Sequence, residues 1–118
     1  MNYTLLFYQG EEHFAARTDP QKREAFWASF LPYMKALQDA GVVVAGAGLE
    51  PPHTATTVRL QDGSRLVQDG PYADTKEQLG GFFIISVPDL DAALEWAARF
   101  PAEAGRIVEV RPNLPHRE

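Results

Sequence analysis

The stretch DGPYADTKEQLGG, residues 69–81, decides how the rest of this 118-residue chain is arranged. It connects two segments whose β-branched and aromatic residues predict strands, SRLVQ (64–68) and GFFIISV (81–87). The connector is polar, carries Lys76 and three carboxylates, and has glycines near both ends. It therefore separates two strands and also gathers side chains suited to chemistry.

Turn and capping preferences explain much of this connector. Gly70-Pro71 favours a turn, and Asp74 with Glu77 three residues later matches a capping box at the start of one helical turn. Gly80-Gly81 allows the chain to leave the loop. The same helical turn presents free backbone N–H groups beside Lys76, an arrangement that binds anions. The sequence gives the structural and the functional interpretation equal weight.

Strand patterns occur on both sides of the connector. Strands are predicted at residues 2–9, 42–48 and 106–112 from runs of aliphatic and aromatic residues. Asp62-Gly63 lies between two β-prone runs, which is the strongest short-range signal for a hairpin.

Two helices are predicted between these strands. The first begins at Thr18-Asp19-Pro20 and ends at Gly41, whose left-handed conformation closes a helix. Pro32 lies inside this helix and is expected to kink it near residues 28–31 or to break it into two. Asp89, just after Pro88, is expected to cap the second helix.

The element order β, α, β, hairpin, β, α, β predicts an α+β fold of the ferredoxin-like (split βαβ) type with an inserted hairpin. Residues 1–118 form one domain, with residues 112–118 as a loose C-terminal tail. Two helices cover one face of such a sheet, yet the strands carry apolar residues on both faces. We therefore expect a homodimer that packs sheet against sheet.

Composition narrows the classes of function. The net charge of −5 argues against a nucleic-acid partner, which needs clustered lysine and arginine. The chain has no cysteine, so a disulfide framework and a thiolate nucleophile are excluded. Its apolar runs are too short to span a bilayer, and the N-terminus lacks the basic region of a signal peptide. We expect a cytoplasmic protein with no membrane contact.

The connector DGPYADTKEQLGG, together with GAGLEPPHTATTVR (46–59) and EVRP (109–112), resembles the DGPF branch of the YCII-related family. The likeness covers nearly the whole chain. It implies a dimeric α+β barrel with a pocket between sheet and helices, and no agreed reaction. Some members resemble partners of extracytoplasmic-function sigma factors, and others resemble small lyases or isomerases.

The resemblance also implies a catalytic dyad, a histidine on the first helix paired with an aspartate near the end of that helix. Asp39 occupies the aspartate position, whereas the histidine position falls at about Phe30. This departure from the family pattern moves the predicted chemistry to the connector.

The candidate site residues follow from the connector and its surroundings. Asp69 and Glu77 are predicted as catalytic carboxylates, because partial burial at a pocket wall raises a carboxyl pKa toward that of a general base. The predicted ligand-binding residues are Lys76, Tyr72, Asp39 and His53. His13 and His116 are expected at the surface, and the spacing of the histidines predicts no metal site.

Three functions compete at this point. The first is a cofactor-independent acid–base enzyme, of lyase or isomerase type, acting on a small polar or aromatic anion. The second is a ligand-sensing or regulatory module linked to a sigma factor, which needs a pocket but no acid or base. The third is a purely structural dimer.

Overall fold

The structure is a computed structural model that describes residues 1–115, so the prediction for His116 lies outside the described residues. The elements in chain order are β1 (Asn2–Gln9), α1 (Glu11–Ala16), α2 (Arg23–Asp39), β2 (Val43–Gly48), the 3₁₀ turn η1 (Pro52–Thr54), β3 (Thr56–Gln61), β4 (Ser64–Asp69), β5 (Gln78–Ser86), α3 (Leu90–Ala98) and β6 (Ile107–Pro112). This mixture of antiparallel sheets and helices confirms the α+β class. Among the described residues, no helix is both long and apolar enough to cross a membrane.

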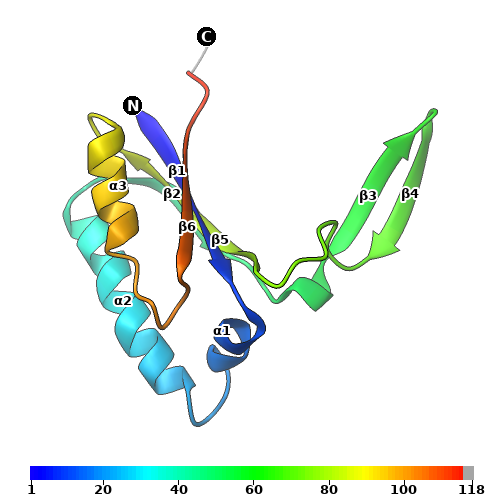
Figure 1. Cartoon of the computed structure of the whole chain (residues 1–118). Coiled ribbons are helices and arrows are strands. Elements are labelled where there is room, and N and C mark those ends of the chain that lie inside the picture. The colour runs from blue at the N-terminus through cyan, green and yellow to red at the C-terminus, as the bar shows by residue number, and fades with distance from the viewer. Residues whose placement is uncertain (116–118) are drawn as a thin grey trace.

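Four strands form the main sheet in the order β2-β5-β1-β6, with every neighbouring pair antiparallel. Leu5 of β1 lies opposite Phe83 of β5 on one side and Val110 of β6 on the other. Helices α2 and α3 lie on one face of this sheet (Figure 1). Because side chains alternate along a strand, Tyr3, Leu5 and Phe7 all point into the layer beneath the helices and are buried.

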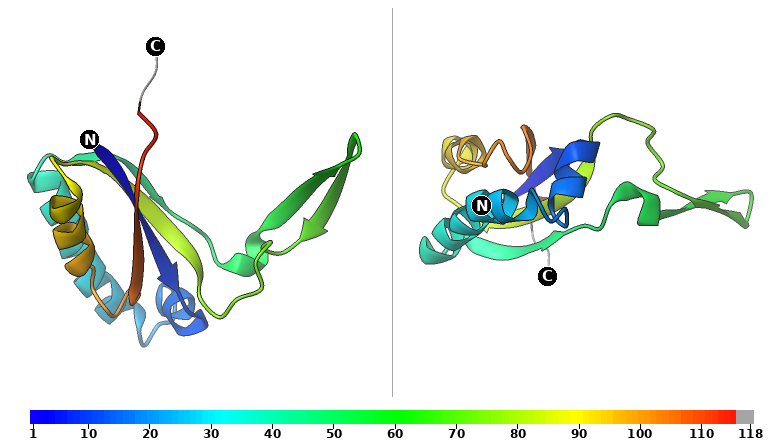
Figure 2. Two further views of the ribbon diagram at one scale, coloured as in Figure 1. Left: turned by 45° about the horizontal axis from the view of Figure 1, so that its top comes forward. Right: turned by 90° about the horizontal axis from the view of Figure 1, so that it is seen from below.

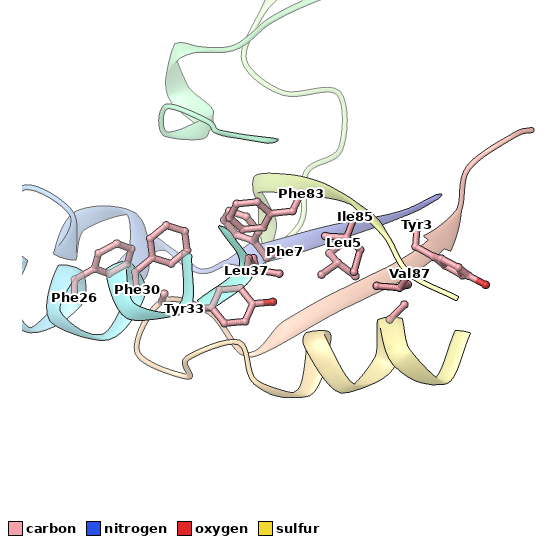
Figure 3. Close-up of a cluster of buried hydrophobic side chains, with 12 residues drawn as sticks. Tyr3, Leu5, Phe7, Phe26, Phe30, Tyr33, Leu37, Phe83, Ile85 and Val87 are labelled. Atoms are coloured by element: carbon pink, nitrogen blue, oxygen red, sulfur yellow. The ribbon is translucent and has the colours of Figure 1, made fainter. Parts of the chain in front are cut away.

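Aromatic rings fill the space between helix α2 and the sheet (Figure 3). The ring of Phe30 lies 6.0 Å from that of Phe7, 6.3 Å from that of Phe83 and 5.9 Å from that of Phe100, measured between centroids. Tyr33, one turn further along α2, lies 5.3 Å from Phe100. These spacings are those of edge-to-face and offset contacts, so Phe30 is a central core residue.

Helix α2 begins later than predicted and is not divided. The Asp19 carboxylate accepts a hydrogen bond from the backbone N–H of Gln21 at 2.8 Å, which holds a turn before Arg23. Pro32 lies inside the continuous helix and is exposed to solvent, so the break that was one of two predicted outcomes does not occur. Gly41 has φ 71°, which confirms the predicted left-handed residue after the helix.

The short helix α1 was not predicted. It follows Gly10 directly, and the backbone N–H of Gly10 donates to Nδ1 of His13 at 3.0 Å. His13 is only 9% exposed, so the prediction of a surface histidine is wrong. Its imidazole is buried because it closes the first turn of α1 in the way that a capping side chain does.

The predicted hairpin is confirmed, but it stands apart from the main sheet. Asp62 and Gly63 both have positive φ, 49° and 75°, as a two-residue turn between β3 and β4 requires. The two strands form a separate sheet that projects from the body as an arm (Figures 1 and 2).

The end of the chain closes the sheet. The Asp89 carboxylate accepts from the backbone N–H of Ala92 at 2.9 Å, which confirms the predicted cap of α3. Pro112 is the last residue of β6, and Asn113 donates its backbone N–H to the carbonyl of Asn2 at 2.9 Å. Within the described residues the chain is therefore held to β1 as far as Asn113, one residue past the predicted start of the tail.

Candidate functional site

The larger polar cavity lies where β1 passes into α1, opposite the connector that leads into β5. Its volume is about 700 Å³. It is lined by Gln9, Gly10, Glu11, Glu12, Phe14, Pro51, Pro52, His53, Pro71, Asp74, Thr75, Lys76, Glu77 and Gln78. Three separate segments of sequence thus meet here: the start of α1, the 3₁₀ turn η1 and the connector.

Three of the predicted site residues line this cavity. Lys76 and Glu77 come from the connector, and His53 comes from η1. Glu77 is half-buried, whereas Lys76 and His53 are exposed. An imidazole, a carboxylate and an ammonium group around one cavity can donate and accept protons and can orient an oxygen atom of a ligand.

Acidic side chains outnumber basic ones in the lining of the cavity. Four carboxylates line it, those of Glu11, Glu12, Asp74 and Glu77, against the single ammonium group of Lys76. No ion pair forms within residues 1–115 between Lys76 and any of these carboxylates. Lys76 is therefore free to contact a ligand, while the carboxylates disfavour a ligand with several negative charges.

The connector holds its shape without the predicted helical turn. Residues 70–77 form bends and no helix, so the prediction that Asp74 and Glu77 form a capping box is wrong. Instead, the side-chain amide of Gln78 donates to the carbonyl of Ala73 at 2.7 Å and to that of Thr75 at 3.1 Å. Thr75 Oγ1 donates to the carbonyl of Glu77 at 2.6 Å. Side chain to backbone bonds of this kind compete with a helix for the same backbone groups.

The other predicted site residues lie away from this cavity. Asp69 is the exposed last residue of β4, and Tyr72 is 79% exposed on the connector; neither lines the cavity. Asp39 lies on the last turn of α2 and forms an exposed ion pair with Lys35 at 2.8 Å. Phe30, which the resemblance places at about the histidine position, belongs to the core described above.

A polar cluster around the half-buried Arg17, behind the cavity, was missed by sequence reasoning. The Arg17 guanidinium donates to the carbonyls of Leu49 and Gly80 and to the side-chain oxygen of Gln9, with 2.9 Å to Gly80. Gln9 in turn donates to the carbonyl of Ala104 and is 1% exposed. Burial lowers the pKa of Arg17, an effect that the nearby Glu50 carboxylate partly offsets. This cluster ties together the ends of β1, β2 and β5 at the back of the site.

A second cavity of about 470 Å³ adjoins the first. The two share Phe14, Pro51 and His53, and the second also includes Arg17 and Trp27. His53 therefore lies at the junction of the two. The only signal for this in the sequence was its position after Pro51-Pro52 at the end of a glycine-rich strand.

Two further hollows have no acidic side chain and no histidine in their linings. One of about 160 Å³ lies between α2 and β2, with an apolar lining apart from Gln38. Another of about 520 Å³ lies beside α3 and β6, where Arg106 is the one charged residue of the lining. Residues 1–115 also contain no group of three or more histidine, aspartate and glutamate side chains that could hold a metal ion.

Comparison with known proteins relates the chain to a curated protein and to a solved structure. The chain is 34% identical over 97 residues to "Uncharacterized protein R00369" of Rhizobium meliloti (strain 1021), which covers 82% of this chain and 77% of that protein. It is similar in structure to 5-chloro-2-hydroxyhydroquinone dehydrochlorinase (TftG) from Burkholderia phenoliruptrix AC1100 in complex with 2,5-dihydroxybenzoquinone, with a TM-score of 0.53. That match covers 97% of this chain and 94% of the other at 16% identity, so it shows a shared fold alone.

The family model that matches is the YCII-related domain, over residues 1–115. This match spans every residue that the structure describes, from β1 to the end of the sheet. The chain belongs to the YCII-related domain family.

Proposed function

We propose that this chain binds a small polar ring compound in the larger cavity and transfers a proton on it without a cofactor. The observation that carries the proposal is that one cavity of about 700 Å³ brings His53, Lys76 and Glu77 together from two distant segments. Its volume falls in the range that suits a small ligand.

Each lining group has a role in this proposal. Phe14 offers an apolar surface for a ring, and Lys76 orients an oxygen substituent. Glu77 and His53 exchange a proton with the ligand, one accepting it from carbon or oxygen and the other returning it, so no electrons leave the ligand. Asp69 was the other predicted base, but because it does not line the cavity the proposal assigns no proton transfer to it.

The charge of the cavity refines the class of ligand. A small anion was predicted from Lys76, but four carboxylates share the lining with that one lysine. We therefore propose a neutral or singly charged compound whose oxygen atom contacts Lys76. A ligand with two or more negative charges would be repelled by the remaining carboxylates.

The comparisons are consistent with this class of ligand. The similar structure TftG is named as a dehydrochlorinase, and its title describes a complex with 2,5-dihydroxybenzoquinone, a small ring with oxygen substituents. The DGPY motif supports our assignment of this chain to the DGPF branch, for which the resemblance implies lyase- or isomerase-like members.

A second function is favoured by one observation. Most polar groups of the cavity are exposed, namely His53, Lys76, Asp74 and both glutamates of α1. Electrostatic effects on proton transfer are weaker for a solvated side chain than for one in a site that excludes water. A ligand-sensing module needs this cavity but no turnover. The sigma-factor partner of such a module stays a prediction of the resemblance.

Binding is tested first, with a matched pair of lysine variants. A panel of hydroxylated and oxo-substituted ring compounds, 2,5-dihydroxybenzoquinone among them, is screened by thermal shift with Lys76→Ala and Lys35→Ala. A compound present at a hundred times its Kd stabilises the fold by about 2.7 kcal/mol. We expect a shift that Lys76→Ala abolishes and Lys35→Ala retains, because Lys35 pairs with Asp39 away from the cavity. A shift that both variants retain would place binding elsewhere.

Turnover is tested on a compound that passes the first experiment. Exchange of its carbon-bound hydrogens with D₂O, followed by NMR, reports proton transfer without knowledge of the product. We expect exchange in the wild type, and its loss in Glu77→Gln and His53→Asn with binding kept. Binding without exchange in the wild type would leave the sensing module as the function.

A further inference from the structure

The second cavity, of about 470 Å³, differs in chemical character from the larger one. Phe14 and Trp27 are its aromatic side chains, and Arg17 and Glu50 are its charged ones, beside the shared His53. The larger cavity has four carboxylates against one ammonium group, whereas the second has one carboxylate against one guanidinium. An anionic group is therefore repelled less in the second cavity than in the first.

The aromatic walls of the second cavity are held in place. The Trp27 indole donates from Nε1 to the carbonyl of Arg17 at 3.0 Å. The same indole meets the rings of Phe26 and Phe30 edge to face, at 4.9 and 5.8 Å between centroids. The Arg17 guanidinium lies 4.9 Å from the centroid of the Phe14 ring. A ligand that enters this cavity thus meets side chains whose positions are already fixed.

Arg17 has no charged partner in contact with it. Its acceptors described above are two backbone carbonyls and one amide oxygen, all uncharged. Within residues 1–115 no carboxylate lies within ion-pair distance of Arg17. Arg17 is half-buried, and the Glu50 carboxylate that acts on it from further away is exposed. The cavity therefore contains a partly desolvated positive charge that no contacting anion neutralises.

The guanidinium also has a donor to spare. It carries five N–H groups, and its three hydrogen bonds use both N–H groups of Nη2 and one of Nη1. The Nε N–H group has no acceptor among the residues that the structure describes. No unpartnered side-chain polar atom of those residues is fully buried, so Nε is accessible. An oxygen atom in the cavity can accept a charge-assisted hydrogen bond from it.

We propose that the second cavity is a subsite for a single carboxylate at Arg17, and that the ligand is a ring compound with one carboxylate-bearing side chain. The inference rests on the proposed function, in which the larger cavity takes the ring beside Lys76. The side chain of the ligand passes His53, which lines both cavities. The reverse orientation would place the carboxylate among the four acidic side chains of the larger cavity, so the charges of the two cavities fix the direction of the ligand.

A matched pair of ligands tests the subsite. 4-Hydroxyphenylacetate and 4-hydroxyphenylacetamide share a ring and nearly a shape, and they differ in charge. Hydroxybenzoate, hydroxyphenylpropionate and their amides extend the pair to a shorter and a longer side chain. NMR titration of the ¹⁵N-labelled chain gives each Kd and follows the Nε–H signal of Arg17. We expect at least one acid to bind about tenfold more tightly than its amide and to shift that signal.

Two variants are expected to change the preference for the acid in opposite directions. Arg17→Gln removes the charge and should abolish the preference; a general loss of structure would weaken acid and amide alike. Glu50→Gln leaves the hydrogen bonds of Arg17 in place and removes the opposing charge. It should tighten binding of the acid by about threefold and leave the amide unchanged. Glu95→Gln, at an exposed position of α3 that lines neither cavity, should change neither.

The outcomes separate this inference from the proposed function. Equal Kd values for every acid and its amide, or a preference that Arg17→Gln and Glu50→Gln both leave unchanged, would overturn the carboxylate subsite and leave the ring site standing. Failure of every acid to bind would overturn it too, and the neutral ring compounds then test the larger cavity by themselves. An acid that needs Arg17 but binds Lys76→Ala as tightly as the wild type would support the subsite and count against the proposed function.

Discussion

Tyr33 is a residue whose chemistry is set by burial. It is 6% exposed on α2, and its hydroxyl donates to the carbonyl of Trp96 at 2.8 Å. Burial raises the pKa of Tyr33 from 10.0 to about 12, and the charge of Arg99 acts in the opposite direction. The neutral phenol is therefore favoured in the folded state. Ionising the buried phenol costs the folded state about 3 kcal/mol relative to the unfolded chain, so the free energy of unfolding keeps its full value below pH 10 and falls by this amount as the pH rises through about 12.

Urea unfolding of the wild type and Tyr33→Phe checks this prediction. At pH 8 the variant is expected to be less stable, because the carbonyl of Trp96 loses its donor. Between pH 10 and pH 12 the difference in unfolding free energy between the two proteins should shrink. A constant difference over this range would mean that Tyr33 is ionised as readily in the folded chain as in the unfolded one.

At the same scale, Arg17 shows what a sequence cannot reveal about a site. Its three acceptors, Leu49, Gly80 and Gln9, come from separate segments of the chain, so no local spacing indicates that one guanidinium joins them. Lys76 and Glu77 could be predicted because they sit together in one loop. Asp69 and Tyr72 sit in or beside that loop too, yet neither of them lines the cavity.

Among the elements, β5 contains a glycine, Gly81, whose position leaves no room for a side chain between the neighbouring strands. Gly80-Gly81 was predicted as the exit from the loop into a strand that begins at Gly81, but β5 begins earlier, at Gln78, so both glycines lie inside it and are buried. A Cβ on Gly81 would meet the Phe7 ring and would lie 2.7 Å from the backbone oxygen of Ala47. Gly48, the partner of Gly81 across the β2–β5 pair, has open space at the same position.

Gly81 and Gly48 give a matched prediction about the free energy of unfolding. Gly81→Ala is expected to destabilise the fold by about 1–3 kcal/mol, because a strand backbone cannot move away from the added methyl group without shifting its neighbours. Gly48→Ala is expected to leave the unfolding free energy within about 0.5 kcal/mol of the wild type. Thermal or urea unfolding of the two variants measures this, and an equal cost at both positions would contradict the packing account.

Prediction of the helices and strands from the sequence succeeded where neighbouring residues determine the local structure. Asp62-Gly63 fixes its own turn, and Asp89 caps α3 through a bond to a residue three positions away. It failed where a competing side chain, or the lack of a recognisable cap, decides the local structure. The connector has the residues of a capping box, but the Gln78 side chain binds the same backbone and no helical turn forms. Helix α1 begins after a glycine and so gives no side-chain cap to recognise.

For the whole molecule, the sequence predicts the class of fold and a homodimer. It does not predict that the hairpin projects from the body. The order of strands and helices is enough to predict an α+β domain, because each pattern has its own period. Whether the predicted hairpin joins the sheet or leaves it depends on η1 and the connector at its base, which no pattern describes. The arm therefore appears only in three dimensions (Figure 1), and with it the cavity between its two connecting segments.

The central claim is that the cavity between η1 and the connector binds a ligand. It is tested most directly by NMR titration of the ¹⁵N-labelled chain with the hydroxylated ring compounds. We predict that at least one compound shifts amide signals of residues 74–78 together with those of His53 and Thr54, and that Lys76→Ala removes these shifts. Shifts confined to the apolar hollow between α2 and β2, or none with any compound, would contradict the claim.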